Sequence, residues 1–374
     1  MSVCATQYLP SYTVGTEAYD AIPEVLGNAK IAVIGGKRAL RAASGALSAA
    51  IEGTSISITG TYWYGGQATY ANVDRLCLEP GVRDADALFA VGGGKAVDAC
   101  KIIAHRLCKP LYTLPTIASN CSPVSCISIM YNEDGSFKEI VHLDTPPAHC
   151  FINTHVIADA PQVYLWAGIG DTLAKYYEVS FSMRGDNPWY GSTLGHAISR
   201  MCNGPLLDCA QQAYEDCAHH IASAALEHAA MNIIVSTGLV SGMVGKDYNS
   251  ALAHALFYGL TTIPSVEREH LHGEVVAYGV LVQLAMDGDE GELGKLLPFY
   301  RSLGLPTCLA DLGLSLRDDF SKALAAAEAN EELEHVPYPV TRDKIWKGIR
   351  VLEDKSRACN APASSAPLIP AEEA

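Results

Sequence analysis

A chain of 374 residues is too long for one hydrophobic core and predicts two domains. Hydrophobic residues make up 49% of it and charged residues 18%, which is typical of a globular protein. The net charge of −15 argues against nucleic acid and anionic membranes as partners, but it places no limit on the substrate, because a basic pocket can lie inside an acidic protein.

The first half of the chain alternates strand-like and helix-like runs. Strands are expected at 31–34, 55–59, 87–91 and 111–114, with a turn at 61–66 and helices at 37–51, 71–78 and 95–107. A hairpin is expected from two further strands at 127–131 and 138–142. This alternation predicts a parallel sheet that is covered by helices on both faces.

From residue 159 onward the periodicity becomes helical, with core helices expected at 173–183, 206–235 and 274–286. We therefore predict an α/β N-terminal nucleotide-binding domain over residues 1–158 and an all-α C-terminal metal-binding domain over 159–358. Residues 359–374 are rich in Ala, Pro and Ser and are predicted to be a disordered tail.

Twelve cysteines are scattered along the chain without a CxxC pair, and several lie in apolar runs where cysteine acts as a small hydrophobe. No signal peptide and no apolar stretch long enough to span a bilayer is visible. These features predict free thiols in a reducing compartment and a cytoplasmic protein.

A glycine-rich turn, Gly92-Gly93-Gly94, separates a strand from the helix that begins near Lys95. Such a turn lets backbone N–H groups approach a pyrophosphate, whose charge the helix dipole favours. The turn lacks the GxGxxG spacing, and a tight strand-to-helix turn without a ligand explains it about equally well. Residues 115–120 follow the next strand and should emerge at the same sheet edge, which supports a nucleotide site.

One carboxylate and two imidazoles, Asp171, His254 and His272, lie in three separate motifs of the second half. Together they form the ligand set of a catalytic divalent metal, with a fourth position left for water or substrate.

Five motifs in order carry a family resemblance: GGGKAVD at 92–98, PTIASN at 115–120, GIGDTLAKYYE at 168–178, LAHALFYGLT at 252–261 and HGEVVAYG at 272–279. The chain resembles the iron-containing alcohol dehydrogenase superfamily, in particular its glycerol dehydrogenase-like branch, over residues 8 to 355. The resemblance implies a dehydroquinate synthase-like fold, with a metal and a nicotinamide cofactor in the cleft between two domains. Members of this family are often homo-oligomers, so a homo-oligomer is expected.

The resemblance also implies that Asp171, His254 and His272 bind the metal. A larger branch of the superfamily has a fourth ligand, a histidine, where this chain has Lys175. Because three ligands are typical of zinc-using members, zinc is the expected metal, with iron, nickel and manganese left open.

The cofactor contacts implied by the resemblance, together with the glycine turn itself, are Gly92, Gly93, Gly94, Lys95, Asp98, Thr116, Ser119, Ser125, Ile127 and Tyr131. Members that prefer NAD carry an aspartate where this chain has Gly36, which is followed by Lys37 and Arg38. A missing carboxylate beside two cations favours a 2′-phosphate and hence NADP over NAD. Alternatively, the two cations are merely exposed charges at a helix start.

Two further departures concern the substrate. Cys121 replaces an aspartate that binds a substrate hydroxyl in glycerol dehydrogenases. Lys175 should share a helix face with Asp171. It either pairs with Asp171 or another carboxylate, or faces an anionic substrate group. Together with the missing aspartate at Gly36, both departures resemble hydroxycarboxylate dehydrogenases of this family, whose members reduce 2-oxo acids with NADPH.

We therefore predict a metal-dependent, NAD(P)-linked oxidoreductase that interconverts small 2-oxo acids and 2-hydroxy acids, with the metal polarising the carbonyl. A glycerol or diol dehydrogenase that uses NAD and zinc is the alternative. A lyase resembling dehydroquinate synthase is a third reading, although such lyases have a glutamate where this chain has Asp171.

Overall fold

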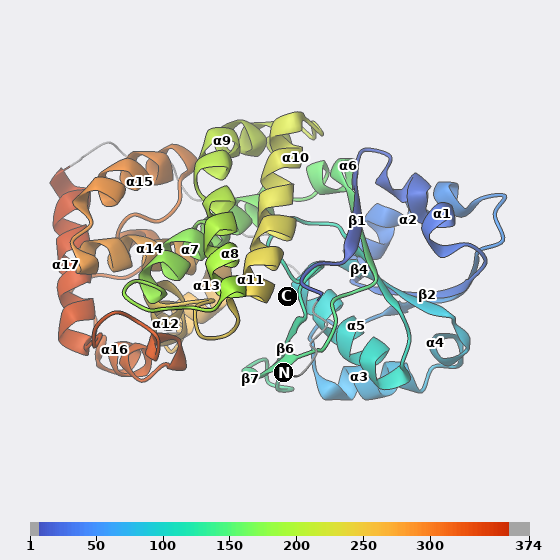
Figure 1. Cartoon of the computed structure of the whole chain (residues 1–374), viewed down its shortest axis with the longest axis horizontal. Helices are drawn as coiled ribbons and strands as arrows, with labels where there is room; N and C mark the ends of the chain where they lie inside the picture. The colour runs from blue at the N-terminus through green and yellow to red at the C-terminus, as the bar shows by residue number, and fades with distance from the viewer. Residues whose placement is uncertain (1–6, 359–374) are drawn as a thin grey trace. The chain divides into compact units, whose positions relative to one another are not determined.

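The structure is a computed structural model that describes residues 7–358, so the predicted tail at 359–374 lies outside the described residues. Two compact units are present (Figure 1). The first contains the residues up to 162 together with 215–242, and the second contains 163–214 and the residues from 243 onward. The domain boundary at 158 and 159 stays a prediction, and it did not include the return of 215–242 to the first unit.

A six-stranded parallel sheet forms the centre of the first unit, in the order β1-β8-β5-β4-β2-β3. Its strands are β1 (Ser11–Gly15), β2 (Lys30–Gly35), β3 (Ser57–Trp63), β4 (Ala87–Gly92), β5 (Leu111–Pro115) and β8 (His149–Asn153). The helices of this part are η1 (Ala18–Ala21), α1 (Ile22–Leu26), α2 (Lys37–Ile51), α3 (Tyr70–Cys77), α4 (Pro80–Asp84), α5 (Gly94–Leu107) and α6 (Thr154–Ala158). This arrangement confirms the predicted α/β fold class.

Alternate residues of the central strands enter two different hydrophobic cores, as a sheet covered on both faces requires. Ile31 and Val33 of β2 pack in one core with Leu47 of α2. Ala32 and Ile34 pack in the other core, which contains residues of α3 and α5. All four of these strand residues are at most 3% exposed, which explains why β2 reads as a continuous apolar run.

The order of the strands reverses at β2. From β2 the chain continues to β3 on one side, and β4 then pairs with β2 on the other side. In open α/β sheets such a switch point leaves a crevice at the carboxyl ends of the two strands, and ligands bind there. The residues that follow β2 and β4 are therefore the first place to look for a ligand.

Several strands differ from the sequence prediction. The strands β1 and β8, which pair with each other, were not expected. The strand expected at 55–59 is β3, which runs on to Trp63, so the turn expected at 61–66 was wrong in its first half. The hairpin is confirmed as the antiparallel pair β6 (Ile127–Tyr131) and β7 (Phe137–His142).

The helix expected over 206–235 is interrupted. It is replaced by α9 (Gly204–Ala218), α10 (Ala224–Met231), the π-helical turn η3 (Asn232–Ser236) and α11 (Thr237–Val244). His220 has a φ of 58°, a left-handed conformation that ends α9. Ser223 then caps α10, because its side chain accepts a hydrogen bond from the N–H of Leu226.

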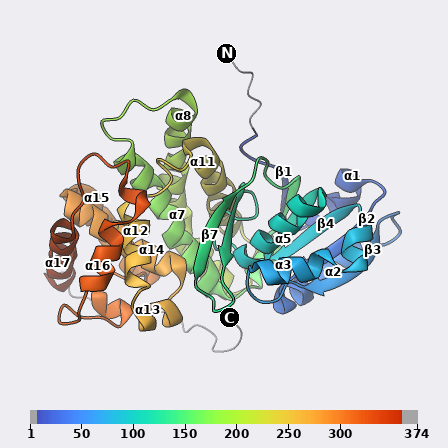
Figure 2. The same ribbon diagram turned by 90° about the horizontal axis from the view of Figure 1, so that it is seen from below.

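Up to residue 358, all regular secondary structure of the second unit is helical (Figure 2). They are α7 (Gln162–Ser182), α8 (Tyr190–Ser199), η2 (Arg200–Cys202), most of α9, the end of α11, α12 (Leu252–Leu260), α13 (Pro264–Glu269), α14 (His272–Asp287), α15 (Glu290–Leu303), η4 (Leu309–Leu312), α16 (Ser321–Glu328), η5 (Glu331–Leu333) and α17 (Arg342–Ala358). This confirms the predicted helical C-terminal part. No helix among residues 7–358 combines the length and the apolar character that crossing a membrane requires.

Candidate active site

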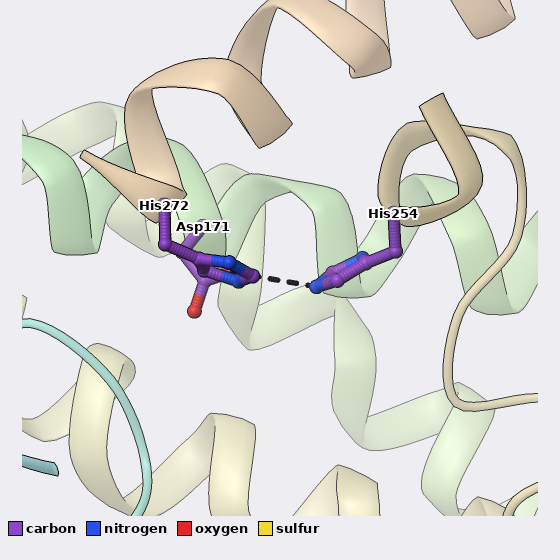
Figure 3. Close-up of side chains that lie close together, drawn as sticks. All are labelled: Asp171, His254 and His272. Atoms are coloured by element: carbon purple, nitrogen blue, oxygen red, sulfur yellow. Dashed lines mark ion pairs between the residues drawn. The ribbon is translucent and has the colours of Figure 1, made fainter. Parts of the chain in front are cut away.

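Three side chains with metal-ligand chemistry converge in the second unit (Figure 3). Asp171 lies in the middle of α7, His254 in the first turn of α12, and His272 at the start of α14. Asp171 Oδ1 lies 3.6 Å from His254 Nε2 and 3.3 Å from His272 Nε2, and the three donor atoms all lie within 4.8 Å of one another. The structure therefore brings together the three residues that the sequence singled out.

Glycines let the helices that carry these residues approach one another. A Cβ atom on Gly170 would lie 2.6 Å from the carbonyl oxygen of Gly273, and one on Gly273 would lie 2.0 Å from that of Ala167. These glycines adjoin Asp171 and His272 in the sequence. A larger residue at either position would force α7 and α14 apart and separate the two ligands.

His254 is held by a second carboxylate, that of Glu178. This residue lies in the motif at 168–178, but the sequence analysis assigned it no role. Glu178 Oε2 lies 2.6 Å from His254 Nδ1, and Oε1 accepts hydrogen bonds from the backbone N–H groups of Ala251 and His254. Glu178 is fully buried. Its position seven residues, or about two helical turns, after Asp171 on the same helix was the available signal, but only the fold shows that it reaches His254.

Opposing effects set the charges in this cluster. Burial by itself would raise the pKa of Asp171, but hydrogen bonds and attraction from His254 and His272 lower it well below its usual range. Burial would lower the pKa of His254, but Glu178 and Asp171 together raise it to about 10. In the absence of a cation, a proton thus occupies the space between anionic oxygens and imidazole nitrogens.

The donor set fits a divalent cation. Two imidazole nitrogens and one carboxylate oxygen face one another, and the proton held there can be replaced by a metal ion. Asp171 and His254 are each 9% exposed, whereas the side chain of His272 is 46% exposed. The site is therefore closed on the His254 side and open on the His272 side, as a catalytic site with a free coordination position requires.

Lys175 lies on the same helix as Asp171, but its ammonium group is directed to a loop. It donates hydrogen bonds to the backbone oxygen and to Oδ1 of Asn249, at 2.9 and 3.0 Å. The residue is 6% exposed. From the sequence we expected Lys175 to pair with a carboxylate or to face an anionic substrate group. Neither alternative predicted its two hydrogen bonds with Asn249.

His270 lies two residues before His272, and its side chain is only 14% exposed. Its Nδ1 lies 2.9 Å from Oε1 of the buried Glu274, whose Oε2 accepts the backbone N–H of Leu271. The hydrogen bond with Glu274 raises the pKa of His270. Glu274 therefore anchors the turn that leads into His272.

In the first unit, the glycine-rich turn and the segment 115–120 lie against each other at the carboxyl edge of the sheet. A Cβ atom on Gly93 would lie 2.6 Å from Ile117 Cδ1, and one on Gly94 would lie 2.7 Å from Asn120 Nδ2. The N–H of Thr116 donates to the carbonyl oxygen of Gly92. Gly93 and Gly94 carry no side chain between this backbone and the start of α5, which fits the close approach of a phosphate there.

The residues after β2 border the same crevice. Gly36 is the N-cap of α2, and a Cβ on Gly92 would lie 3.8 Å from its backbone nitrogen. Lys37 is exposed, and its Nζ lies 4.6 Å from the ring centroid of Trp63 at the end of β3. The two N-termini of α2 and α5 thus face the switch point between β2 and β4.

Three of the predicted cofactor contacts, Asp98, Ser125 and Ile127, lie in a buried polar network around Lys101, a residue that the sequence analysis did not single out. Lys101 Nζ donates hydrogen bonds to Asp98, Ser122, Ser125 and the carbonyl oxygen of Ile127, and it is 2% exposed. Burial raises the pKa of Asp98 and lowers that of Lys101, while their mutual attraction opposes both shifts. A lysine inside an apolar helix was the signal that could have found this network.

The other predicted contacts lie nearby in the first unit. Lys95 Nζ lies 5.4 Å from the ring centroid of Tyr131, and Ser119 is half-buried. Cys121 is half-buried, and its Cβ would lie 3.5 Å from a Cβ on Gly238 of α11. The structure therefore gathers all the predicted nucleotide residues into one unit, and the predicted metal ligands into the other.

The comparisons of this chain with known proteins agree on one family. The profile of the family "Iron-containing alcohol dehydrogenase" matches residues 10–154. A glycerol dehydrogenase of Thermotoga maritima is 32% identical over 79% of this chain and 81% of its own length. Hydroxycarboxylate dehydrogenase A of Escherichia coli K12 is also 32% identical, over 77% of this chain and 80% of its own length. The crystal structure of glycerol dehydrogenase from Schizosaccharomyces pombe superposes with a TM-score of 0.83 at 26% identity, covering 96% of this chain and 92% of that one.

Proposed function

Because this chain belongs to the iron-containing alcohol dehydrogenase family, we propose that it is a metal-dependent, NAD(P)-linked oxidoreductase that interconverts small 2-oxo acids and 2-hydroxy acids. The observation that carries the proposal is the convergence of Asp171, His254 and His272 within 4.8 Å. Oxidoreductase chemistry of the family requires such a metal site in addition to a nucleotide site, and this chain has residues suited to both.

In this proposal Asp171, His254 and His272 hold the cation, and zinc is the metal we expect. When bound, the cation would supply Lewis-acid polarisation of a carbonyl oxygen and the nicotinamide would supply the hydride. Asp171 contributes the one negative charge of the ligand set, and Glu178 keeps the His254 ring in place. The exposed edge of His272 leaves room for a small substrate on that side.

The nucleotide would be held at the carboxyl edge of the sheet. The pyrophosphate would lie on the glycine cradle at the start of α5, with Gly94, Lys95 and Thr116 around it. Gly36 and Lys37 would face the adenosine ribose, and an exposed ammonium there favours the 2′-phosphate of NADP. Asp98, Ser125 and Ile127 would act through the network of Lys101, which stiffens this edge.

Two features support an acid as the substrate. Cys121 has no carboxylate that could bind a polyol hydroxyl. One relative, which is 32% identical to this chain, is a hydroxycarboxylate dehydrogenase. Lys175 lies one helical turn from Asp171 and is the nearest candidate partner for a substrate carboxylate, if its bonds to Asn249 exchange when substrate binds.

A glycerol or diol dehydrogenase is the second candidate, and two observations favour it. Lys175 already has two hydrogen bonds with Asn249, which fit a purely structural role. The relative from Thermotoga maritima, at the same identity, is a glycerol dehydrogenase.

The test is the oxidation of NADPH and NADH by the zinc-loaded protein with 2-oxobutyrate, 2-oxoglutarate, phenylpyruvate and dihydroxyacetone. We expect faster turnover of the oxo acids, with NADPH ahead of NADH. Turnover of dihydroxyacetone alone would leave the glycerol or diol dehydrogenase. Stoichiometric loss of reduced cofactor also separates a dehydrogenase from a lyase that recycles its nicotinamide.

Lys175→Thr separates the two roles of the lysine. If Lys175 binds the substrate carboxylate, the variant raises KM for 2-oxobutyrate more than KM for dihydroxyacetone. Asn249→Ala is the matched control, because it removes a side-chain partner of Lys175 and keeps the ammonium group. An unchanged KM ratio in Lys175→Thr would contradict the carboxylate role.

A further inference from the structure

One face of α7 carries four polar residues at spacings of four, three and four: Asp171, Lys175, Glu178 and Ser182. All are buried. Asp171 faces both histidines, while the other three reach residues 249–254, which lead into α12. Lys175 binds Asn249, and the hydroxyl of Ser182 donates to the carbonyl oxygen of Ser250. This face of α7 therefore shapes the segment that delivers His254.

The start of α12 has no cap of its own. Its N-cap residue is Ala251, whose side chain cannot accept a hydrogen bond, although the first N–H groups of a helix need acceptors. Two other helices provide them. Glu178 Oε1 accepts the N–H groups of Ala251 and His254, at 2.8 and 2.9 Å, and Gln283 Oε1 on α14 accepts that of Leu252, at 3.2 Å.

The second oxygen of Glu178 acts on the side chain of His254. Oε2 lies 2.6 Å from Nδ1, and because Glu178 is fully buried, no water competes for this bond. A carboxylate oxygen accepts only, so Nδ1 must carry the proton. The lone pair of the neutral ring is then on Nε2, which is the atom that faces Asp171 at 3.6 Å.

We propose that Glu178 is the positioning residue of the metal site, which at once caps α12 and fixes the His254 ring in the tautomer that presents Nε2 to a cation. This inference rests on the proposed metal site. It also explains why the two histidines differ. Glu178 binds Nδ1 of His254, whereas His272 is half exposed and its ring packs edge-on against that of Phe257, with 4.3 Å between the ring centroids. His254 is the preformed ligand, and His272 closes the site.

Glu178→Gln tests the proposal, because it keeps the shape and the capping oxygen but replaces Oε2 by an NH2 group. That group donates to Nδ1, so the ring must carry its proton on Nε2 and point it at the cation. Loss of such an outer partner typically weakens metal binding about 10–100-fold. We expect a loss of zinc affinity in this range, measured by competition with a chromophoric chelator, and only a small change in the Tm of the metal-free protein.

The matched control is Gln283→Met, which removes the other acceptor at the start of α12 without touching the His254 ring. We expect it to lower Tm and to leave zinc affinity unchanged. Equal zinc affinity of Glu178→Gln and the wild type, or an equal loss in Gln283→Met, would overturn the proposal. Wild-type protein that binds no divalent cation would overturn both this inference and the proposed function.

A measurement on the unmodified protein covers the case in which Glu178→Gln fails to fold. In the zinc-loaded wild type, the ¹⁵N chemical shift of His254 Nδ1 should be that of a protonated nitrogen. An unprotonated Nδ1 shift would overturn the proposal, whatever the variant does.

Discussion

Gly36→Asp should change the choice of nucleotide. The position is the N-cap of α2, with φ −72° and ψ 148°, a conformation that any residue adopts. A Cβ atom there meets only Ala39 and Tyr64, both at 3.8 Å, which is ordinary contact. Because aspartate is at least as good an N-cap as glycine, the variant should fold normally.

The size of the effect follows from one charged hydrogen bond. A carboxylate at this place would accept a bond from a ribose hydroxyl of NADH but would repel the 2′-phosphate of NADPH, which we propose that Lys37 attracts in the wild type. A hydrogen bond to a charged group contributes about 1.5–3 kcal/mol. With about 1.4 kcal/mol for each factor of ten, the ratio of kcat/KM for NADPH over NADH should fall roughly 10- to 150-fold.

The assay compares both nucleotides with one carbonyl substrate, and direct binding by quenching of tryptophan fluorescence serves as a second readout. Gly36→Ala is the control, since it adds the Cβ without the charge and should leave the ratio unchanged. If Gly36→Asp and Gly36→Ala give the same ratio, the carboxylate does not face the ribose, and the assignment of this crevice to the adenosine half is wrong.

Two further predictions concern protons and buried charge. The pKa of His254 is raised from 6.5 to about 10, so its protonation stabilises the metal-free fold fully below pH 6.5, and this contribution is lost as pH rises through about 10. Below pH 10, zinc must displace this proton in order to bind. Calorimetry of zinc binding at pH 7.5, in buffers of different ionisation enthalpy, should therefore show about one proton released. A heat of binding that does not depend on the buffer would contradict this prediction. Lys101→Met should cost about 3–5 kcal/mol in urea unfolding, because it leaves Asp98 buried without its partner. Adding Asp98→Asn should restore part of that loss, and a double variant no more stable than Lys101→Met would count against the pairing.

The sheet and the cluster of Asp171, His254 and His272 were predictable because each has a local signal. Apolar runs of four or five residues between segments of helical periodicity predict buried parallel strands such as β2 and β4. Asp171, His254 and His272 are chemically distinctive residues in motifs whose order can be compared with a family. The edge strand β1 has a weaker pattern, since it is half exposed and contains Ser11, Tyr12 and Thr13.

Other features depend on contacts that no local pattern records. Lys101 stands out as a lysine within an apolar helix, but only the packing of α5 against β6 surrounds it with acceptors. Glu178 lies within a recognised motif, but its partners are more than seventy residues away in the sequence. The bonds of Lys175 to Asn249 were missed for the same reason, since Asn249 belongs to a loop without regular structure.

The capping of α12 by other helices has a consequence for the order in which the protein folds. A nine-residue helix with an alanine N-cap is too short to persist alone, so α12 can complete its first turn only after α7 and α14 have packed around it. We therefore expect the imidazole of His254 to be positioned only after α7 and α14 have packed. Before that, the three side chains of the proposed metal site lie apart in the chain, so we expect metal binding to follow folding rather than to start it.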